Sequence, residues 1–120
     1  MKLDSLIPVL YTENIEATLQ FYAIHLHFVC NNYDEDIGWA SISNGDIELM
    51  LSKPNAHADF TKPVFTGSFY FKVQYVDELW NNLKDKVQVC YPLENFDYGM
   101  REFAIHDNNG YLLQFGCEAE

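Results

Sequence analysis

Residues 99–116 of the chain read GMREFAIHDNNGYLLQFG, two largely apolar runs on either side of an Asn-Gly pair. Asn109 and Gly110 suit a type I′ turn, because both central residues of that turn need a positive φ angle. The runs at residues 101–107 and 111–117 are rich in aromatic and aliphatic side chains, as strands are. The stretch therefore predicts a β-hairpin near the end of the chain.

Counted together with this hairpin, the expected elements fall into two halves with the same order. In the first half, a helix with its apolar face at Ile15, Leu19, Tyr22 and Leu26 lies among strands at residues 6–11, 27–33, 38–43 and 46–52. In the second half, a helix with an apolar stripe at Val76, Leu79, Trp80 and Leu83 lies among strands at residues 68–73, 87–91, 101–107 and 111–117. Each half reads βαβββ, an internal duplication that predicts an α+β fold of two modules.

The length of the chain fits one domain. Its 120 residues are 48% hydrophobic, which is enough to bury a core. We expect a single domain whose modules span about residues 5–52 and 66–118. The linker between them, at about residues 53–65, carries two prolines and mixed polarity.

The charge of the chain argues against anionic partners. Seven basic and eighteen acidic residues give a net charge of −11, which repels phosphate backbones and anionic membranes. We therefore expect neither nucleic acid nor a membrane as a partner. The same charge would concentrate cationic ligands near a concave site, although an acidic surface that only keeps the protein soluble explains it equally well.

The cysteines favour a reducing compartment. Cys30, Cys90 and Cys117 are odd in number and far apart, so they indicate neither a disulfide framework nor a zinc knuckle. The first residues lack the long apolar run of a signal peptide, and no stretch reaches the ~20 apolar residues that cross a bilayer. We expect a cytoplasmic protein.

Three stretches span nearly the whole chain: IPVLY at residues 7–11 with Asn14-Ile15 and Phe21-Tyr22, GDIEL at residues 45–49, and residues 99–116. Together they resemble the vicinal oxygen chelate superfamily of glyoxalases, bleomycin-resistance proteins and dioxygenases. The last stretch is similar to the bleomycin-resistance-like branch, where Arg-Glu-Phe, a strand, an Asp-x-x-Gly hairpin and a strand ending Leu-Gln-Phe-Gly occur together. This chain has Asp107-Asn108-Asn109-Gly110 in place of the usual Asp-Pro-Asp-Gly, which keeps the turn chemistry.

The resemblance implies two strongly curved half-barrels around a cup that holds the ligand, and a homodimer whose second subunit often completes the pocket. Alternation along the strands predicts which side chains face the cup. They are Asp46, Glu48, Met50 and Ser52 in the first module, and Ser68, Tyr70, Lys72, Leu112, Gln114 and Gly116 in the second. The face of His106 stays open, because Phe103 and Ile105 suit either side.

Metal-dependent members of the superfamily hold one divalent ion with inward side chains from the first and last strands of each module. Carried over to this chain, those positions are Ile7, Glu48, Ser68 and Gln114. Only Glu48 is a strong ligand, so the set falls short of two histidines and a carboxylate. His25, His27 and His57 are expected at the surface and His106 in the core or at the rim, so we expect no cofactor.

The leading hypothesis is a metal-free protein that binds a small organic molecule, similar to bleomycin-resistance proteins that sequester an antibiotic. Tyr11, Trp39, Tyr70 and Tyr98 would stack on an aromatic or cationic ligand, and the carboxylates of Asp46 and Glu48 would attract its charge. The remaining candidate ligand-binding residues are Met50, Ser68, Arg101 and Gln114.

The competing hypothesis is a metal-dependent enzyme of the same superfamily, either a glyoxalase-like lyase or a ring-cleaving dioxygenase. The sequence has no Gly-x-Ser-x-Gly elbow and no phosphate-binding glycine loop. Glu48 is the one candidate general base, and a carboxylate that only accepts hydrogen bonds from Gln114, Ser68 or a tyrosine explains it equally well. A structural or regulatory subunit without a ligand is a third hypothesis.

Metal analysis separates the first two hypotheses. Protein purified without chelators is expected to carry less than one equivalent of any transition metal, because the metal positions lack ligands. Added zinc or nickel should leave the Tm unchanged, and a metal that binds the native state would raise it by mass action. An ion bound at near-unit stoichiometry would favour the enzyme instead.

Overall fold

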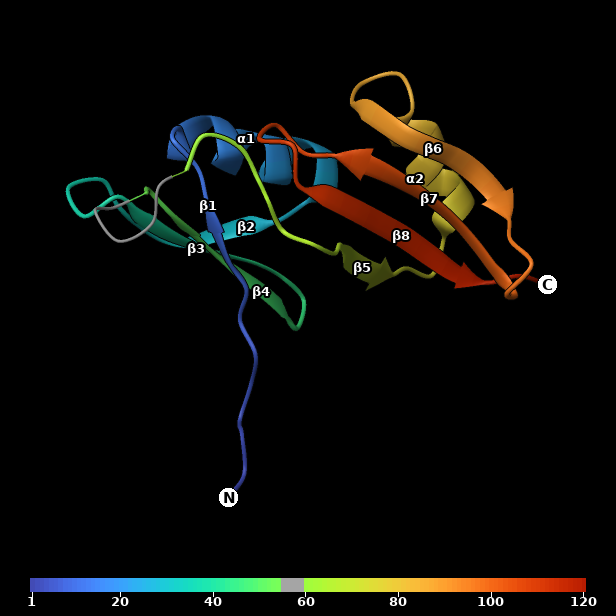
Figure 1. Cartoon of the computed structure of the whole chain (residues 1–120), viewed down its shortest axis with the longest axis horizontal. Coiled ribbons are helices and arrows are strands. Elements are labelled where there is room, and N and C mark those ends of the chain that lie inside the picture. The colour runs from blue at the N-terminus through green and yellow to red at the C-terminus, as the bar shows by residue number, and fades with distance from the viewer. Residues whose placement is uncertain (55–59) are drawn as a thin grey trace. The chain divides into compact units, whose positions relative to one another are not determined.

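Each half of the chain forms its own four-stranded sheet with one helix (Figure 1). The computed structural model describes residues 1–54 and 60–120, and it divides into two compact units, Met1–Thr61 and Lys62–Glu120. Both units have the element order βαβββ, and in both the first strand pairs in parallel with the last. The predicted α+β fold of two modules is confirmed.

The first unit has the strand order β1-β4-β3-β2. Its strands are β1 (Val9–Tyr11), β2 (Val29–Asp34), β3 (Trp39–Asn44) and β4 (Ile47–Ser52). Helix α1 (Ile15–Leu26) begins after Asn14, whose side chain accepts a hydrogen bond from the amide of Ala17. The core consists of one face of the sheet and one stripe of the helix, namely Leu10, Ala40, Ile42, Leu49, Leu51, Ile15, Tyr22 and Leu26.

The second unit repeats this order as β5-β8-β7-β6. Its elements are β5 (Phe69–Lys72), α2 (Val76–Leu83), β6 (Gln88–Asn95), β7 (Met100–His106) and β8 (Leu112–Glu118). The ring of Phe115 stacks between those of Phe71 and Phe103, with centroids 5.2 and 5.3 Å away, and Trp80 of α2 lies 5.1 Å from Phe103. Aromatic packing therefore joins the helix to the central strands.

The hairpin between β7 and β8 is confirmed, but its turn is not type I′. Gly110 has a φ of 104°, whereas Asn109 is not among the described residues with a positive φ. The amide of Gly110 donates to the carbonyl of Asp107, and the Asp107 carboxylate accepts from the amides of Asn109, Gly110 and Tyr111. The aspartate therefore holds the turn, and only the glycine needs the left-handed region.

Two strand boundaries differ from the prediction by more than two residues. β1 begins at Val9, and Leu6, which was predicted to open it, is exposed. β6 continues to Asn95, with register shifts between Val89 and Tyr91 and again between Tyr91 and Glu94. Such bulges admit Pro92, which has no N–H for a regular ladder.

Part of the predicted linker, residues 55–59 with His57, lies outside the described residues. Across the ranges that are described, neither helix has the length and apolar character to cross a membrane.

Helix α1 ends on a residue in an unusual conformation. His27 adopts the left-handed region with a φ of 59°, and the following amide, that of Phe28, donates to the carbonyl of Tyr22. This conformation is strained for an L-residue, whose Cβ comes close to a backbone carbonyl oxygen, whereas glycine has no Cβ and adopts it without that strain.

We expect His27→Gly to raise the free energy of unfolding by about 1 kcal/mol, because the exposed imidazole loses no packing. His25→Gly, two residues earlier in the helical region, is the matched control and should lower it by about 1 kcal/mol. Urea unfolding of the two variants measures both changes, and a destabilised His27→Gly would contradict the strain argument.

Candidate functional site

The second unit buries a carboxylate on the face of its sheet that α2 does not cover, which we call the open face. Glu102 of β7 is 1% exposed. Its Oε1 accepts a hydrogen bond of 3.1 Å from the hydroxyl of Tyr70, and its Oε2 accepts one from the hydroxyl of Tyr91. Both oxygens of this carboxylate are therefore satisfied by tyrosines.

Gln114 of β8 extends this network. Its Nε2 donates to the hydroxyl oxygen of Tyr91 at 2.8 Å and to Oε2 of Glu102 at 3.4 Å. Its Oε1 accepts a hydrogen bond from the hydroxyl of Ser68. The five residues Ser68, Tyr70, Tyr91, Glu102 and Gln114 form one hydrogen-bonded group, the Glu102 cluster.

The strand register brings the cluster together. Gln114 lies beside Tyr70 on one side and Ala104 on the other, and Ala104 also pairs with Tyr91. Paired residues share a face of the sheet, so these side chains point the same way. Tyr91 reaches this face only because of the register shift after Val89, whose own partner, Ile105, lies in the core.

Gly116 provides the space for the cluster. It lies opposite Glu102 in the ladder. A Cβ at this position would come within 2.1 Å of the Tyr70 hydroxyl oxygen and 2.9 Å of the Glu102 Cβ. The absence of a side chain at residue 116 is therefore what lets the Tyr70 hydroxyl approach Glu102.

The cluster keeps its tyrosines protonated. Burial, followed by the hydrogen bond to Glu102, raises the pKa of Tyr70 to about 12. The same two causes raise the pKa of Tyr91 and, more weakly, that of Tyr98. The hydroxyls of Tyr70 and Tyr91 therefore remain neutral donors toward the carboxylate throughout the neutral range.

An aromatic surface extends from the cluster to solvent. Phe96 meets Tyr91 edge to face, with centroids 5.5 Å apart. Phe96 also stacks with Tyr98, with centroids 5.5 Å apart and 11° between the planes, and Tyr98 is 64% exposed. We call Phe96 and Tyr98 the aromatic platform, a flat surface that suits a planar ligand.

The first unit carries its candidate residues on its own uncovered face. Its register pairs Tyr11 and Trp39 with Ser52, and Met50 with Ser41. Glu48 is half-buried and accepts a hydrogen bond of 3.0 Å from the hydroxyl of Ser41. Tyr11, Trp39, Glu48 and Met50 therefore share one face, and Asp46 lies before β4.

Within the second unit, three candidates from the sequence, Ser68, Tyr70 and Gln114, belong to the Glu102 cluster, and Tyr98 lies in the platform. The candidates predicted from the sequence did not include Glu102, Tyr91 or Phe96. One signal for Glu102 was available, since a buried Phe103 sends its neighbours in the strand to the open face.

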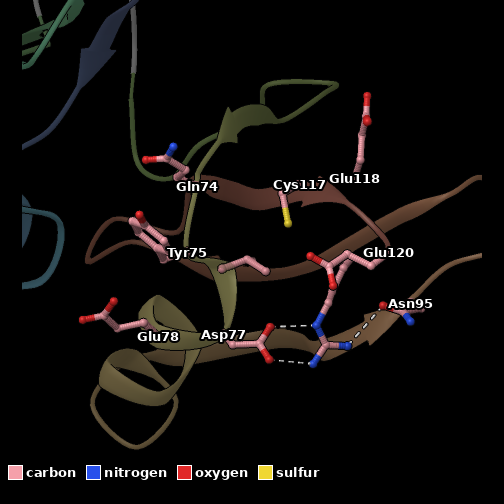
Figure 2. Close-up of a pocket in the computed structure, with 10 residues that line it drawn as sticks. Gln74, Tyr75, Asp77, Glu78, Asn95, Cys117, Glu118 and Glu120 are labelled. Carbon is pink, nitrogen blue, oxygen red and sulfur yellow. Dashed lines mark hydrogen bonds and ion pairs between the residues drawn. The ribbon is translucent and has the colours of Figure 1, made fainter.

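Arg101 is not near the cluster, because it pairs with Cys117 on the face that α2 covers. Its guanidinium donates to the carboxylate of Asp77 at 2.7 and 3.1 Å and to the side chain of Asn95 at 3.1 Å. The dashed lines in Figure 2 run to these two partners, at the edge of a cavity of about 500 Å³. Arg101 therefore lies apart from the other candidates of the second unit, and its charge is matched by Asp77.

The face of His106 is now resolved. The residue pairs with Leu112 and Gln88, on the side of the sheet opposite the buried rings of Phe103 and Ile105. It is half-buried, and its Nε2 is buried without a hydrogen-bond partner among the described residues. His106 thus lies at the rim of the open face, two positions from Ala104.

The positions that hold a metal in the superfamily do not fit a divalent ion here. Ile7 has no donor atom, Ser68 and Gln114 are hydrogen-bonded to each other, and Glu48 is held by Ser41. Within residues 1–54 and 60–120, no three His, Cys, Asp or Glu side chains gather as a metal site requires. The metal-free state of the protein remains a prediction.

Comparison with known proteins establishes the family. The model of the glyoxalase/bleomycin resistance protein/dioxygenase superfamily matches residues 2–115. The chain belongs to this superfamily. The resemblance stated from the sequence is thereby confirmed, and the two βαβββ units are those of the superfamily fold. None of the curated proteins matches the sequence.

Solved structures of the superfamily align over nearly the whole chain. A superfamily protein from Nocardioides has a TM-score of 0.82 at 14% identity, covering 100% of this chain and 86% of its own. The bleomycin resistance determinant of transposon Tn5 has a TM-score of 0.76 at 20% identity, covering 98% and 100%. The bleomycin-binding protein of Streptomyces verticillus, solved with copper(II)-bleomycin, has a TM-score of 0.70 at 25% identity, covering 100% and 99%.

The space at residue 116 can be tested directly. Gly116→Ala should lower the free energy of unfolding by about 1–3 kcal/mol, because the new methyl group overlaps Tyr70 and Glu102. Adding Tyr70→Phe removes the nearest atom and should restore part of the loss. A double-mutant cycle by thermal unfolding measures the coupling, and strictly additive losses would show that Tyr70 does not cause the clash.

Proposed function

We propose that the protein binds a small organic molecule on the open face of its second unit, without a metal ion. The observation that carries this proposal is the exposed ring of Tyr98, stacked on Phe96 beside the buried Glu102. An exposed aromatic ring held in place by a second ring is a preformed stacking surface, which loses little conformational entropy when a ligand binds.

The chemistry of this face favours an aromatic ligand. The platform offers a flat apolar surface, and the Glu102 cluster supplies polar groups in fixed orientations next to it. Ligand sites commonly combine an apolar wall with a few placed polar groups in this way. The net charge of −11 further favours cationic over anionic ligands at the encounter stage.

One relative supports an antibiotic as the ligand. The bleomycin-binding protein of Streptomyces verticillus is 25% identical over the full length of this chain, and its structure contains copper(II)-bleomycin. Glycopeptides of that kind carry both flat aromatic rings and positive charge. Bleomycin therefore belongs in the first set of compounds to be tested, together with simpler aromatic cations.

Tyr98→Ala should weaken binding of any hit about 3- to 10-fold, because an aromatic pair contributes about 0.5–1.5 kcal/mol beyond its buried area. Hits would come from a thermal-shift screen and be titrated by calorimetry. Tyr75→Ala is the matched control, since Tyr75 is a similarly exposed tyrosine, at 68%, before α2. Equal losses in both variants, or no hit among bleomycin and the aromatic cations, would contradict the proposal.

A further inference from the structure

Glu102 is buried without a positively charged partner among the described residues. The ion pair found in residues 1–54 and 60–120 is that of Arg101 with Asp77, on the other face of the sheet. Lys72 shares the open face, opposite Gly116, but makes no ion pair with Glu102. A buried carboxylate is costly unless its charge is compensated as well as hydrogen-bonded.

Among the described residues, the hydrogen bonds to Glu102 come from neutral groups. Tyr70, Tyr91 and Gln114 donate to its two oxygens. An ionised carboxylate can only accept, and all three of these groups can donate to it. The cluster therefore solvates a negative charge with dipoles, as water would, and leaves the charge itself unmatched.

The carboxylate also orients the hydroxyl of Tyr70. Because this hydroxyl gives its proton to Glu102, its oxygen has only lone pairs left for any further partner. The oxygen of Tyr91 already accepts from Gln114, whereas none of the described residues donates to the oxygen of Tyr70. Tyr70 is 40% exposed, and its hydroxyl oxygen lies 3.1 Å from Oε1 of the buried Glu102.

A positively charged hydrogen-bond donor satisfies both conditions at once. We propose that the open face selects an organic monocation, an ammonium or amidinium group on an aromatic ring system, that donates to the Tyr70 oxygen and compensates Glu102. The ring system lies on Phe96 and Tyr98. This inference rests on the proposed function and specifies its ligand class.

Three naphthalene compounds of nearly equal shape test the charge requirement. They are 2-naphthylmethylammonium, the neutral 2-naphthalenemethanol and the anionic 2-naphthoate. The Kd of each is measured by fluorescence titration against the full chain. We expect the ammonium compound to bind roughly tenfold or more tightly than the alcohol, as a charge-assisted hydrogen bond implies, and the carboxylate not to bind.

Two variants locate the source of this preference. Glu102→Gln keeps the shape of the side chain and removes its charge, so the ammonium compound should lose its advantage while the Kd of the alcohol stays within about twofold. Tyr70→Phe keeps the carboxylate and removes the hydroxyl oxygen that would accept from the ammonium group. If circular dichroism shows that Glu102→Gln does not fold, Tyr70→Phe replaces it as the test of the preference. Glu78→Gln is the matched control, because it removes the same charge from an exposed turn of α2. This variant should still bind the ammonium compound more tightly than the alcohol.

The outcomes separate this inference from the proposed function. If the ammonium compound and the alcohol bind the unaltered protein equally, the charge selection is wrong and the aromatic site stands. If neither binds, both are wrong. If the preference survives in Glu102→Gln and in Tyr70→Phe, the charge is recognised elsewhere and the inference is overturned.

Discussion

The pairing of β7 with β8 places two very different contacts on the two sides of one ladder. On the covered side Phe103 lies opposite Phe115, and their stacked rings bind the sheet to α2. On the open side, one position along, Glu102 lies opposite Gly116. A slip of one residue would exchange these sides, so the aromatic core fixes the position of the buried carboxylate. The site therefore depends on the same register that stabilises the unit.

The two units use one topology to support unequal sites. In the first unit the carboxylate belongs to the last strand, where Glu48 is half-buried and accepts one hydrogen bond from the hydroxyl of Ser41. In the second unit the carboxylate belongs to the third strand, where Glu102 is buried. It accepts hydrogen bonds from two tyrosine hydroxyls and from the side-chain amide of Gln114. The two units thus share one strand order, while the polar groups on their uncovered faces differ.

The sequence predicted the fold well because its signals are local. The spacing of Ile15, Tyr22 and Leu26 indicates a helix within a few residues, and the alternation in residues 112–116 identifies Leu113 and Phe115 as core. The turn after Asp107 was placed correctly, although its type was wrong. The carboxylate of Asp107 accepts hydrogen bonds from the amides of Asn109 and Gly110. In a tighter turn these amides would be left to backbone acceptors.

The candidate site was harder to predict, because it depends on register. Strict alternation from Val89 sends Tyr91 into the core, and only the bulge between them turns it to the open face. Glu102 and Arg101 are neighbours in the sequence and point to opposite faces of the sheet. A register predicted one position out therefore places Arg101, the partner of Asp77, on the open face instead of Glu102. Neither bulges nor register leave a clear mark in a single sequence.

The Glu102 cluster takes at least one residue from each strand of its sheet: Tyr70 from β5, Tyr91 from β6, Glu102 from β7 and Gln114 from β8. No pair of neighbouring strands can assemble it alone. A chain in which either outer strand has detached, such as a partly unfolded state, loses a tyrosine that solvates the carboxylate. Assembly of the cluster and completion of the sheet are therefore one cooperative event, and a ligand bound as proposed would favour the state in which all four strands are paired.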